Sequence, residues 1–321
     1  MIITDFVMSL QEELEKRNMS ESSILQYIKV LLNLYKKIHG NEKLNSLKFL
    51  KDLELIEKTI KENYKETSQK NIYNILRSIL YPHKEKKGFK NVYDFYKEKS
   101  EDINKEIIKN VSQNKKTDTQ EKNWITWDEV KKIQDDLKTE TNKIISKKNI
   151  GSSEYETLLK NVVLHLYTEL PPRRNEYQHL LIVPNSDDLD DNKNYYVKDE
   201  GKFILNNYKT SKKYGKQIIE VPDNLTTAIN NYLQYHTLFN ASKKKKNYEI
   251  PFLVNKSGVP LTQVNSLTRL LNKIFKKNIG ASMLRHIYLS DKYGEDLEEM
   301  KEDSKMMGHS LGQQKEYIKK D

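Results

Sequence analysis

The sequence predicts a mainly helical protein of two units, the second of which carries a small antiparallel sheet. Three observations support this fold class. Apolar residues recur at helical spacing through the first hundred residues, a polar segment without periodicity covers residues 109–123, and short strand-like runs mix with helical patterns after residue 124. The 321 residues are enough for two domains. We therefore expect a helical unit over 1–108, a linker over 109–123 and a mixed unit over 124–321.

The first unit shows three clear helix patterns. One begins after Ser20, a residue type favoured at N-caps, and stops at Gly40, a residue type favoured at helix ends. The other two cover residues 3–14 and the segment "SQKNIYNILRSILYP", which ends at Pro82. The apolar stripes of the three patterns lie at positions 3, 6, 10 and 14, at 24, 27, 28, 31, 35 and 38, and at 72, 75, 76, 79 and 80.

The second unit alternates between helical and strand patterns. Thr126 and Glu129 have the spacing of a capping box, and a helix is expected over 154–168. The runs "HLLIV", "NYYVKD", "KFILNNYK" and "KQIIEVP" predict strands, and the turn-rich segments between them favour an antiparallel sheet. Further helices are expected over 223–237, 262–276, 282–293 and 296–306.

The composition limits the chemistry and the compartment. The chain has no cysteine, so disulfides and thiol chemistry are excluded. The sequence contains no run of about 18 apolar residues, so it predicts no membrane-spanning helix. The acidic residues early in "MIITDFVMSLQEELEKR" are unlike a secretory signal peptide. We expect a protein of the cytoplasm or the nucleus that is not secreted and has no membrane partner.

The charge indicates a polyanionic partner. Lys and Arg number 56 against 46 Asp and Glu, which gives a formal net charge of +10. Such an excess favours nucleic acid as the ligand. The abundance of Lys, Asn and Ile is also typical of an AT-rich genome, such as that of a virus or mobile element. The run "KKKK" at 243–246 predicts a solvated loop, with a nuclear address as the alternative.

The motifs of several enzyme classes are missing from the sequence. There is no GxxxxGK[ST] phosphate loop, no GxGxxG dinucleotide motif, no HExxH and no GxSxG. The acidic run "DDLDD" at 187–191 lacks the spacing of a calcium loop and predicts a solvated turn. We expect no cofactor and no metal.

A series of basic residues and one late tyrosine remain as candidates for chemistry. "TELPPRRNEYQHL" carries Arg173 and Arg174 after a double proline. "NNYKTSKKYGKQ" carries several lysines at a turn between strands, and "GASMLRHIYLS" carries an arginine near the start of a helix. The motif "MMGHS" and the last tyrosine of the chain complete the series. The candidates after Arg174 are Lys209, Lys212, Arg285, His286, His309 and Tyr317.

In this order the motifs resemble those of the tyrosine recombinase (phage integrase) family. The resemblance covers the whole chain and implies a helical core-binding domain and a mixed α+β catalytic domain that clamp duplex DNA. The box "TELPPRRNE" implies a catalytic Arg173, "YKTSKKYGKQIIEVP" implies Lys209, "SMLRH" implies Arg285, and "MMGHS" implies His309. Tyr317 takes the place of the nucleophile.

The resemblance also implies a mechanism that requires neither ATP nor a metal. The phenol oxygen of Tyr317 attacks a DNA phosphodiester and forms a 3′-phosphotyrosine. Two guanidinium groups stabilise the charge that gathers on the phosphate oxygens, and a lysine protonates the departing 5′ oxygen. The implied partner is double-stranded DNA, on which the protein assembles as a dimer or tetramer. Because only four residues follow Tyr317, we expect a monomer in the absence of DNA.

Three features depart from the family pattern. Ser282 stands where the family usually has histidine, the interval from His309 to Tyr317 is one residue shorter than usual, and two prolines precede Arg173. Two rival readings therefore stay open. One is a type IB topoisomerase, and the other is a DNA-binding relic of a recombinase without catalytic activity.

Several assignments also have alternatives at neighbouring positions. Arg174 competes with Arg173, and Lys212 competes with Lys209. His286 is interpreted as a structural neighbour of Arg285. Taken singly, each of these residues is more often a surface or salt-bridge residue than a catalyst, so the functional reading depends on their order.

Overall fold

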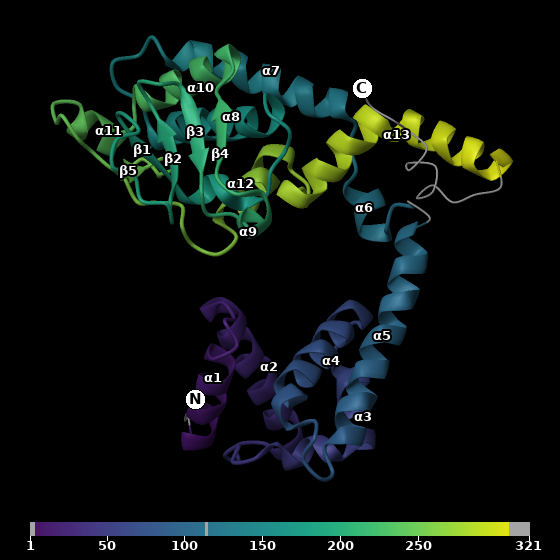
Figure 1. Ribbon diagram of the computed structural model, residues 1–321. Helices are drawn as coiled ribbons and strands as arrows, with labels where there is room; N and C mark the ends of the chain where they lie inside the picture. The colour runs from purple at the N-terminus through teal and green to yellow at the C-terminus, as the bar shows by residue number, and fades with distance from the viewer. Residues whose placement is uncertain (1–3, 113–114, 308–321) are drawn as a thin grey trace. The chain divides into compact units, whose positions relative to one another are not determined.

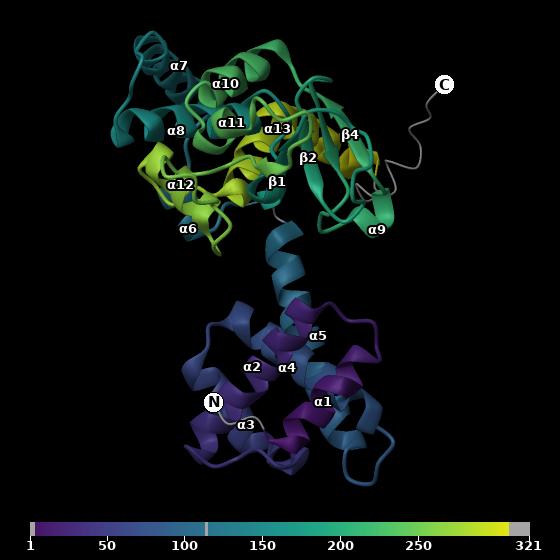
Figure 2. The same cartoon turned by 90° about the vertical axis from the view of Figure 1, so that its left-hand side faces the viewer.

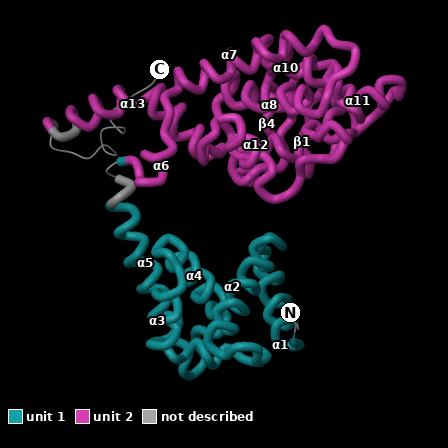
Figure 3. The backbone as a smooth tube through the Cα atoms, turned by 180° about the vertical axis from the view of Figure 1, so that it is seen from behind, with its two compact units in different colours: residues 1–115 teal, residues 116–321 magenta. Residues whose placement is uncertain are grey.

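The computed structural model of the chain describes residues 4–112 and 115–307 (Figure 1). The chain divides into two compact units, residues 1–115 and 116–321 (Figure 3). This division falls inside the segment 109–123, for which we expected a linker. Parts of that segment are helical, because helix α5 (Lys90–Ser112) continues to residue 112 and helix α6 (Asp118–Asn123) begins at 118.

The described residues of unit 1 form helices joined by short connecting segments and contain no strand. Its core consists mainly of leucine and isoleucine side chains, and α4 contacts α2, α3 and α5. The N-cap of α2 is confirmed, since the Ser20 side chain accepts a hydrogen bond from the Ser23 amide, and Gly40 ends the helix with a positive φ of 66°. The helices preceding α5 are α1 (Asp5–Glu15), α2 (Glu21–His39), α3 (Leu53–Asn63) and α4 (Glu66–Leu80), with 3-10 segments at Leu47–Lys51 and Tyr81–His83.

The helices of unit 2 surround one long, buried helix, α8 (Ser152–Thr168). Residues 161–168, the C-terminal half of α8, are buried on all sides, and α8 contacts α7, α10 and α12. A helical segment without a polar face is typical of a domain centre. The predicted capping box at Thr126 and Glu129 is confirmed at the start of α7. The other helices are α7 (Trp127–Ile144), η3 (Asn175–His179), α9 (Ser211–Tyr214), α10 (Asp223–Leu233), α11 (Thr237–Ser242), α12 (Ser266–Phe275) and α13 (Ala281–Met307).

The sheet of unit 2 is mixed, so the predicted antiparallel sheet is wrong in one pairing. The strand order is β4-β3-β2-β1-β5, and Figure 2 shows α9 beside β4. β1 and β2 are parallel, whereas the other neighbours are antiparallel. The strands are β1 (Leu180–Val183), β2 (Asn194–Val197), β3 (Lys202–Leu205), β4 (Gln217–Glu220) and β5 (Ile250–Pro251).

The segment 184–193 explains the parallel pair. We interpreted it as a turn between antiparallel strands. Strands of four residues are only about 13 Å long, so a segment of this length can return the chain to the level at which β1 begins. Leu189 of this segment packs on one face of the sheet beside Leu181 and the buried Val183, Tyr195, Val197 and Ile204. Covering that apolar face favours the crossover over a tight turn.

Four helices predicted in the second unit have different bounds in the structure. The pattern over 223–237 becomes α10 and α11, because the buried His236 caps α11 by accepting a hydrogen bond from the Phe239 amide. The pattern over 262–276 is shortened to α12. The two helices expected over 282–293 and 296–306 form one helix, α13. Gly294 lies inside it, and an interior glycine costs a helix only about 1 kcal/mol relative to alanine.

None of the helices within residues 4–112 and 115–307 combines the length and the apolar character that crossing a bilayer requires.

Candidate active site

Arg173 lies in a fixed segment between α8 and η3. The segment follows the C-terminus of α8 at Thr168, and Pro172 within it is buried. The Tyr167 hydroxyl, on the last turn of α8, donates a hydrogen bond to the Arg174 carbonyl oxygen at 3.0 Å. This bond joins the two ends of the segment. The Arg173 side chain is partly buried, whereas Arg174 is exposed.

The guanidinium of Arg173 contacts both sides of the connection between β3 and β4. Its Nη1 donates a hydrogen bond to Oε1 of Gln217, the first residue of β4, at 2.8 Å. The guanidinium carbon also lies 5.3 Å from the centroid of the Tyr208 ring. Tyr208 directly precedes Lys209 in the sequence. The first predicted catalytic arginine and the segment of the predicted catalytic lysine are therefore neighbours.

Donor capacity remains on Arg173 after these contacts. Its Nε is buried and has no hydrogen-bond partner among the described residues, and the same is true of Glu176 Oε2 and the Tyr177 hydroxyl. A guanidinium carries five N–H donors, of which the described contacts use one. An unpaired buried donor costs about 1–3 kcal/mol. Nε itself is closed off from solvent, so an anionic ligand would be bound by the unused N–H groups of Nη1 and Nη2.

Two buried tyrosines, Tyr167 and Tyr177, lie near Arg173. Burial raises the pKa of Tyr177, the charge of Arg173 opposes this rise, and the charge of Glu176 adds to it. Burial also raises the pKa of Tyr167, whose ring lies edge-on to that of Tyr177 at 5.5 Å. Both phenols stay protonated at neutral pH. Neither competes with Tyr317 as a source of phenolate.

The base of the β3–β4 connection is fixed by hydrogen bonds. The buried Asn194 of β2 accepts hydrogen bonds from the amides of Asn206 and Asn207 at 2.9 and 2.8 Å. Its own amide group donates to the Asn207 carbonyl oxygen at 2.7 Å. The Tyr208 hydroxyl donates to the Gly215 carbonyl oxygen at 2.6 Å, which closes the loop. Gly215 has a φ of 68°, a conformation that favours glycine.

The lysines of this connection project from that fixed base. Lys209 is exposed and follows Tyr208 directly, in the turn before α9. Lys212 is also exposed and lies on α9 itself. Neither ammonium group has a hydrogen bond or ion pair within residues 4–112 and 115–307. Both are free to contact a phosphate backbone.

Arg285 lies in the first turns of α13, where Met283, Leu284 and Ile287 pack into the core. It is partly buried, and among the described residues it has no hydrogen bond or ion pair. Ser282 and His286 flank it and are exposed.

The structure brings together only part of the predicted set. Arg173 and the segment that carries Lys209 meet through Tyr208 and Gln217. In the described part of the chain, no hydrogen bond, ion pair or ring contact joins Arg285 to either of them. His309 and Tyr317 lie outside the described residues.

The sequence analysis missed three residues that organise the site. Tyr208 and Gln217 contact Arg173, and Asn194 fixes the start of the β3–β4 connection. One signal for Gln217 and Tyr208 was available, since they delimit the lysine-rich segment at its two ends. Asn194 gave no signal, because its role depends on the register of the antiparallel β2–β3 pair, which places it beside the residues that follow β3.

The acidic run at 187–191 forms a loop, as expected. The Asp190 carboxylate accepts hydrogen bonds from the amide and the side chain of Asn192, which lower its pKa. Among the described residues, no group of three or more His, Asp or Glu side chains is arranged to hold a metal ion. Comparisons of the chain with protein-family models, with curated proteins and with solved structures found no match.

Proposed function

We propose that the protein is a DNA strand-transfer enzyme of the tyrosine recombinase type. It cuts duplex DNA through a 3′-phosphotyrosine intermediate at Tyr317 and rejoins the strands. Unit 1 is then the core-binding domain and unit 2 the catalytic domain. The protein works in the compartment that holds its target DNA and assembles on that DNA as a dimer or tetramer.

The contact between Arg173 and the β3–β4 connection carries the proposal. Strand transfer requires a cation that neutralises the phosphate and an acid that protonates the leaving oxygen, both beside one phosphodiester. Arg173 has unused donors, and Lys209 follows the tyrosine ring against which that guanidinium lies. Residues that are far apart in the sequence thus supply these two functions in one neighbourhood.

The reaction is an exchange of one phosphodiester for another. The Tyr317 oxygen forms a bond to phosphorus while its proton passes to His309, the bond to the 5′ oxygen breaks, and Lys209 gives that oxygen a proton. Arg173 and Arg285 donate hydrogen bonds to the two nonbridging oxygens as their charge increases. Rejoining reverses these steps with a 5′ hydroxyl as the attacking group, so the energy of the phosphodiester is conserved.

Covalent capture tests this proposal. The protein is incubated with labelled nicked or supercoiled duplex DNA and analysed on denaturing gels. We expect a protein–DNA adduct with a free 5′ hydroxyl on the cut strand. Joining of strands from two differently labelled duplexes is expected of a recombinase. Relaxation of supercoils without such joining would indicate a type IB topoisomerase, and duplex binding without an adduct would indicate a relic without catalytic activity.

The two predicted catalytic arginines should be essential, unlike their neighbour. Arg173→Ala and Arg285→Ala should each slow cleavage by about a hundredfold or more, because each removes a charged donor from the transition state. Arg174→Ala is the matched control and should have a much smaller effect, because its side chain is exposed and, among the described residues, forms no hydrogen bond or ring contact with the β3–β4 connection. Single-turnover cleavage rates measure this. A severe loss in Arg174→Ala with normal cleavage by Arg173→Ala would move the catalytic position by one residue.

Binding to duplex DNA should fall steeply with salt. If the protein neutralises six to ten phosphates, its affinity should drop by roughly a thousandfold or more between about 50 and 200 mM salt. Fluorescence anisotropy with a labelled duplex measures this dependence. An affinity that hardly changes over that range would be incompatible with a DNA-binding enzyme of this kind.

A further inference from the structure

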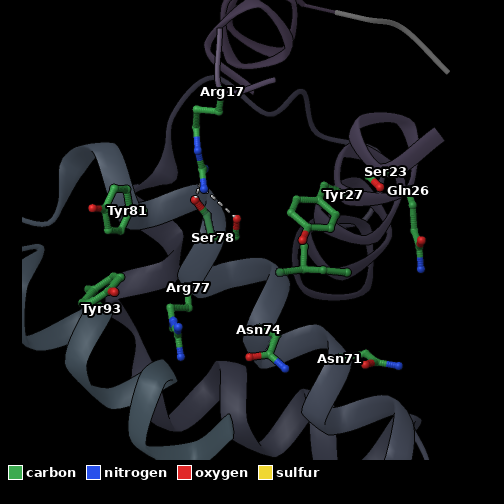
Figure 4. Close-up of a pocket in the computed structure, with 11 residues that line it drawn as sticks. Arg17, Ser23, Gln26, Tyr27, Asn71, Asn74, Arg77, Ser78, Tyr81 and Tyr93 are labelled. Atoms are coloured by element: carbon green, nitrogen blue, oxygen red, sulfur yellow. Dashed lines mark hydrogen bonds between the residues drawn. The ribbon is translucent and has the colours of Figure 1, made fainter. Parts of the chain in front are cut away.

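A polar cavity of about 730 Å³ lies in unit 1, on the side of α4 that faces away from its core (Figure 4). The cavity is bordered by the chain after α1, by α2 and α4, and by the segments around Tyr81 and Tyr93. No carboxylate lines it. The lining residues are Arg17, Ser23, Gln26, Tyr27, Asn71, Asn74, Ile75, Arg77, Ser78, Tyr81 and Tyr93.

One face of α4 supplies the floor of this cavity. Asn71, Asn74 and Ser78 recur at spacings of three and four residues, so they share a face of the helix. The opposite face carries Ile72 and Leu76, which are buried in the core of unit 1. The core therefore fixes which way the two asparagines face.

The side-chain amides in the cavity are unpaired within the described part of the chain, since no hydrogen bond is formed there by the side chains of Asn71, Asn74 and Gln26. Asn63 and Asn104 of the same unit differ, since Asn63 donates to the Thr59 carbonyl oxygen at 2.9 Å and Asn104 accepts from a lysine. Each free amide offers two donors and an acceptor oxygen to a ligand.

Arg17 is held in position over the same cavity. Its Nη1 donates to the Ser78 carbonyl oxygen at 2.7 Å and its Nη2 donates to the Ser78 hydroxyl at 3.2 Å (Figure 4). Its guanidinium carbon lies 5.5 Å from the centroid of the Tyr81 ring. The remaining donors of an exposed, oriented guanidinium suit a phosphate oxygen. Arg77 is partly neutralised, because its Nη1 lies 3.6 Å from Oε1 of Glu101.

The spacing of these groups favours duplex DNA over a small ligand. From Asn71 to Asn74, α4 rises by roughly 4.5 Å, which is slightly more than one base-pair step of about 3.4 Å. An asparagine side chain forms two hydrogen bonds with the N6 and N7 atoms of adenine in the major groove, which is wide enough for a helix. The deep and narrow major groove of an RNA duplex excludes side chains.

We propose that this cavity is a base-recognition site for duplex DNA, in which Asn71 and Asn74 bind adenine bases while Arg17 holds an adjacent phosphate. The inference rests on the proposed function only in taking duplex DNA as the substrate. It assigns to unit 1 a preference for adenine at two nearby positions of the target site. In this proposal, Asn71 and Asn74 determine which DNA sequence is preferred, whereas Arg17 contributes affinity for any duplex.

A binding selection tests the two asparagines. The full-length protein is allowed to select from a library of randomised DNA duplexes, and the enriched sites are sequenced. Asn71→Ala and Asn74→Ala should each reduce the preference for one adenine by about tenfold or more, without changing the salt dependence of binding. The matched control is Asn91→Ala, an exposed residue of α5 outside the cavity, which should select the same sites as the wild type.

A second variant tests the role of Arg17. Arg17→Gln should weaken binding equally for all duplexes and lower the slope of log affinity against log salt by about one. Thermal melting of each variant, followed by circular dichroism, separates loss of recognition from loss of folding. Unchanged site selection by folded Asn71→Ala and Asn74→Ala proteins overturns the inference. Stronger binding of free nucleotides or single-stranded RNA than of duplex DNA, measured by competition against a labelled duplex, also overturns it.

The two proposals fail in different ways. Normal covalent capture together with unchanged site selection by both asparagine variants would reject the recognition site and leave the enzyme proposal intact. Altered site selection in the absence of any covalent adduct would reject the enzyme and leave the recognition site intact.

Discussion

Replacing Tyr317 with phenylalanine should abolish the covalent adduct and leave DNA affinity nearly unchanged. The substitution removes one oxygen atom, which is the proposed nucleophile, and keeps the aromatic ring. Binding depends on many phosphate and base contacts, so the loss of one neutral hydroxyl should change it by less than about threefold. Denaturing gels report the adduct, and anisotropy reports the affinity of the same preparation.

A control for this experiment is available within the chain. Tyr293 is an exposed tyrosine of α13, 48% of which is accessible to solvent, and Tyr293→Phe should form the adduct at the wild-type rate. An adduct that persists in Tyr317→Phe would place the nucleophile elsewhere. The buried Tyr167 and Tyr177 would be poor replacements, because burial raises the pKa of each phenol.

The helical part of the fold was predictable because periodicity and capping are local properties. Ser20, Gly40 and Thr126 have the predicted roles at helix ends. The parallel pairing of β1 and β2 was not predictable in this way. It depends on Leu189 covering a face formed by residues from three strands, which no short window of sequence reveals. The short β5 pairs with β1 through only Ile250 and Pro251, too few residues for an alternating pattern.

The sequence predicts which residues belong to the candidate site, but it does not predict how they are arranged. Their order along the chain indicated Arg173 and Lys209. The contacts that bring these segments together involve Gln217 and Tyr208, which have no chemistry of their own in the proposed reaction. Any side chain of suitable length and polarity can make such a supporting contact. Which residues do so therefore depends on their positions in the tertiary structure and not on a recognisable motif.

Lys209→Ala should cleave ordinary DNA about a hundredfold to ten-thousandfold more slowly than the wild type. The departing 5′ alkoxide is a poor leaving group unless a proton reaches it during bond breaking. Lys209 is exposed and adjoins Tyr208, whose ring packs beside Arg173 and whose hydroxyl is bound to the Gly215 carbonyl oxygen. The backbone from which the ammonium extends is therefore held next to Arg173, the cation that is proposed to bind the phosphate.

Lys212 provides the matched control for this variant. It is exposed like Lys209 but lies on α9, further along the β3–β4 connection. A lysine at that position is suited to contact the DNA backbone. Lys212→Ala should therefore lose some affinity and should cleave bound DNA at close to the wild-type rate.

Sulfur substitution at the 5′ bridging position distinguishes proton donation from other roles of Lys209. A thiolate leaves without protonation, so Lys209→Ala should recover much of its cleavage rate on this DNA. Lys212→Ala should show no such recovery, because its defect is in binding. Recovery in Lys212→Ala alone would exchange the roles of the two lysines. Recovery in neither would place the acid outside the β3–β4 connection, with Ser282 and His286, the exposed neighbours of Arg285, as the next residues to replace.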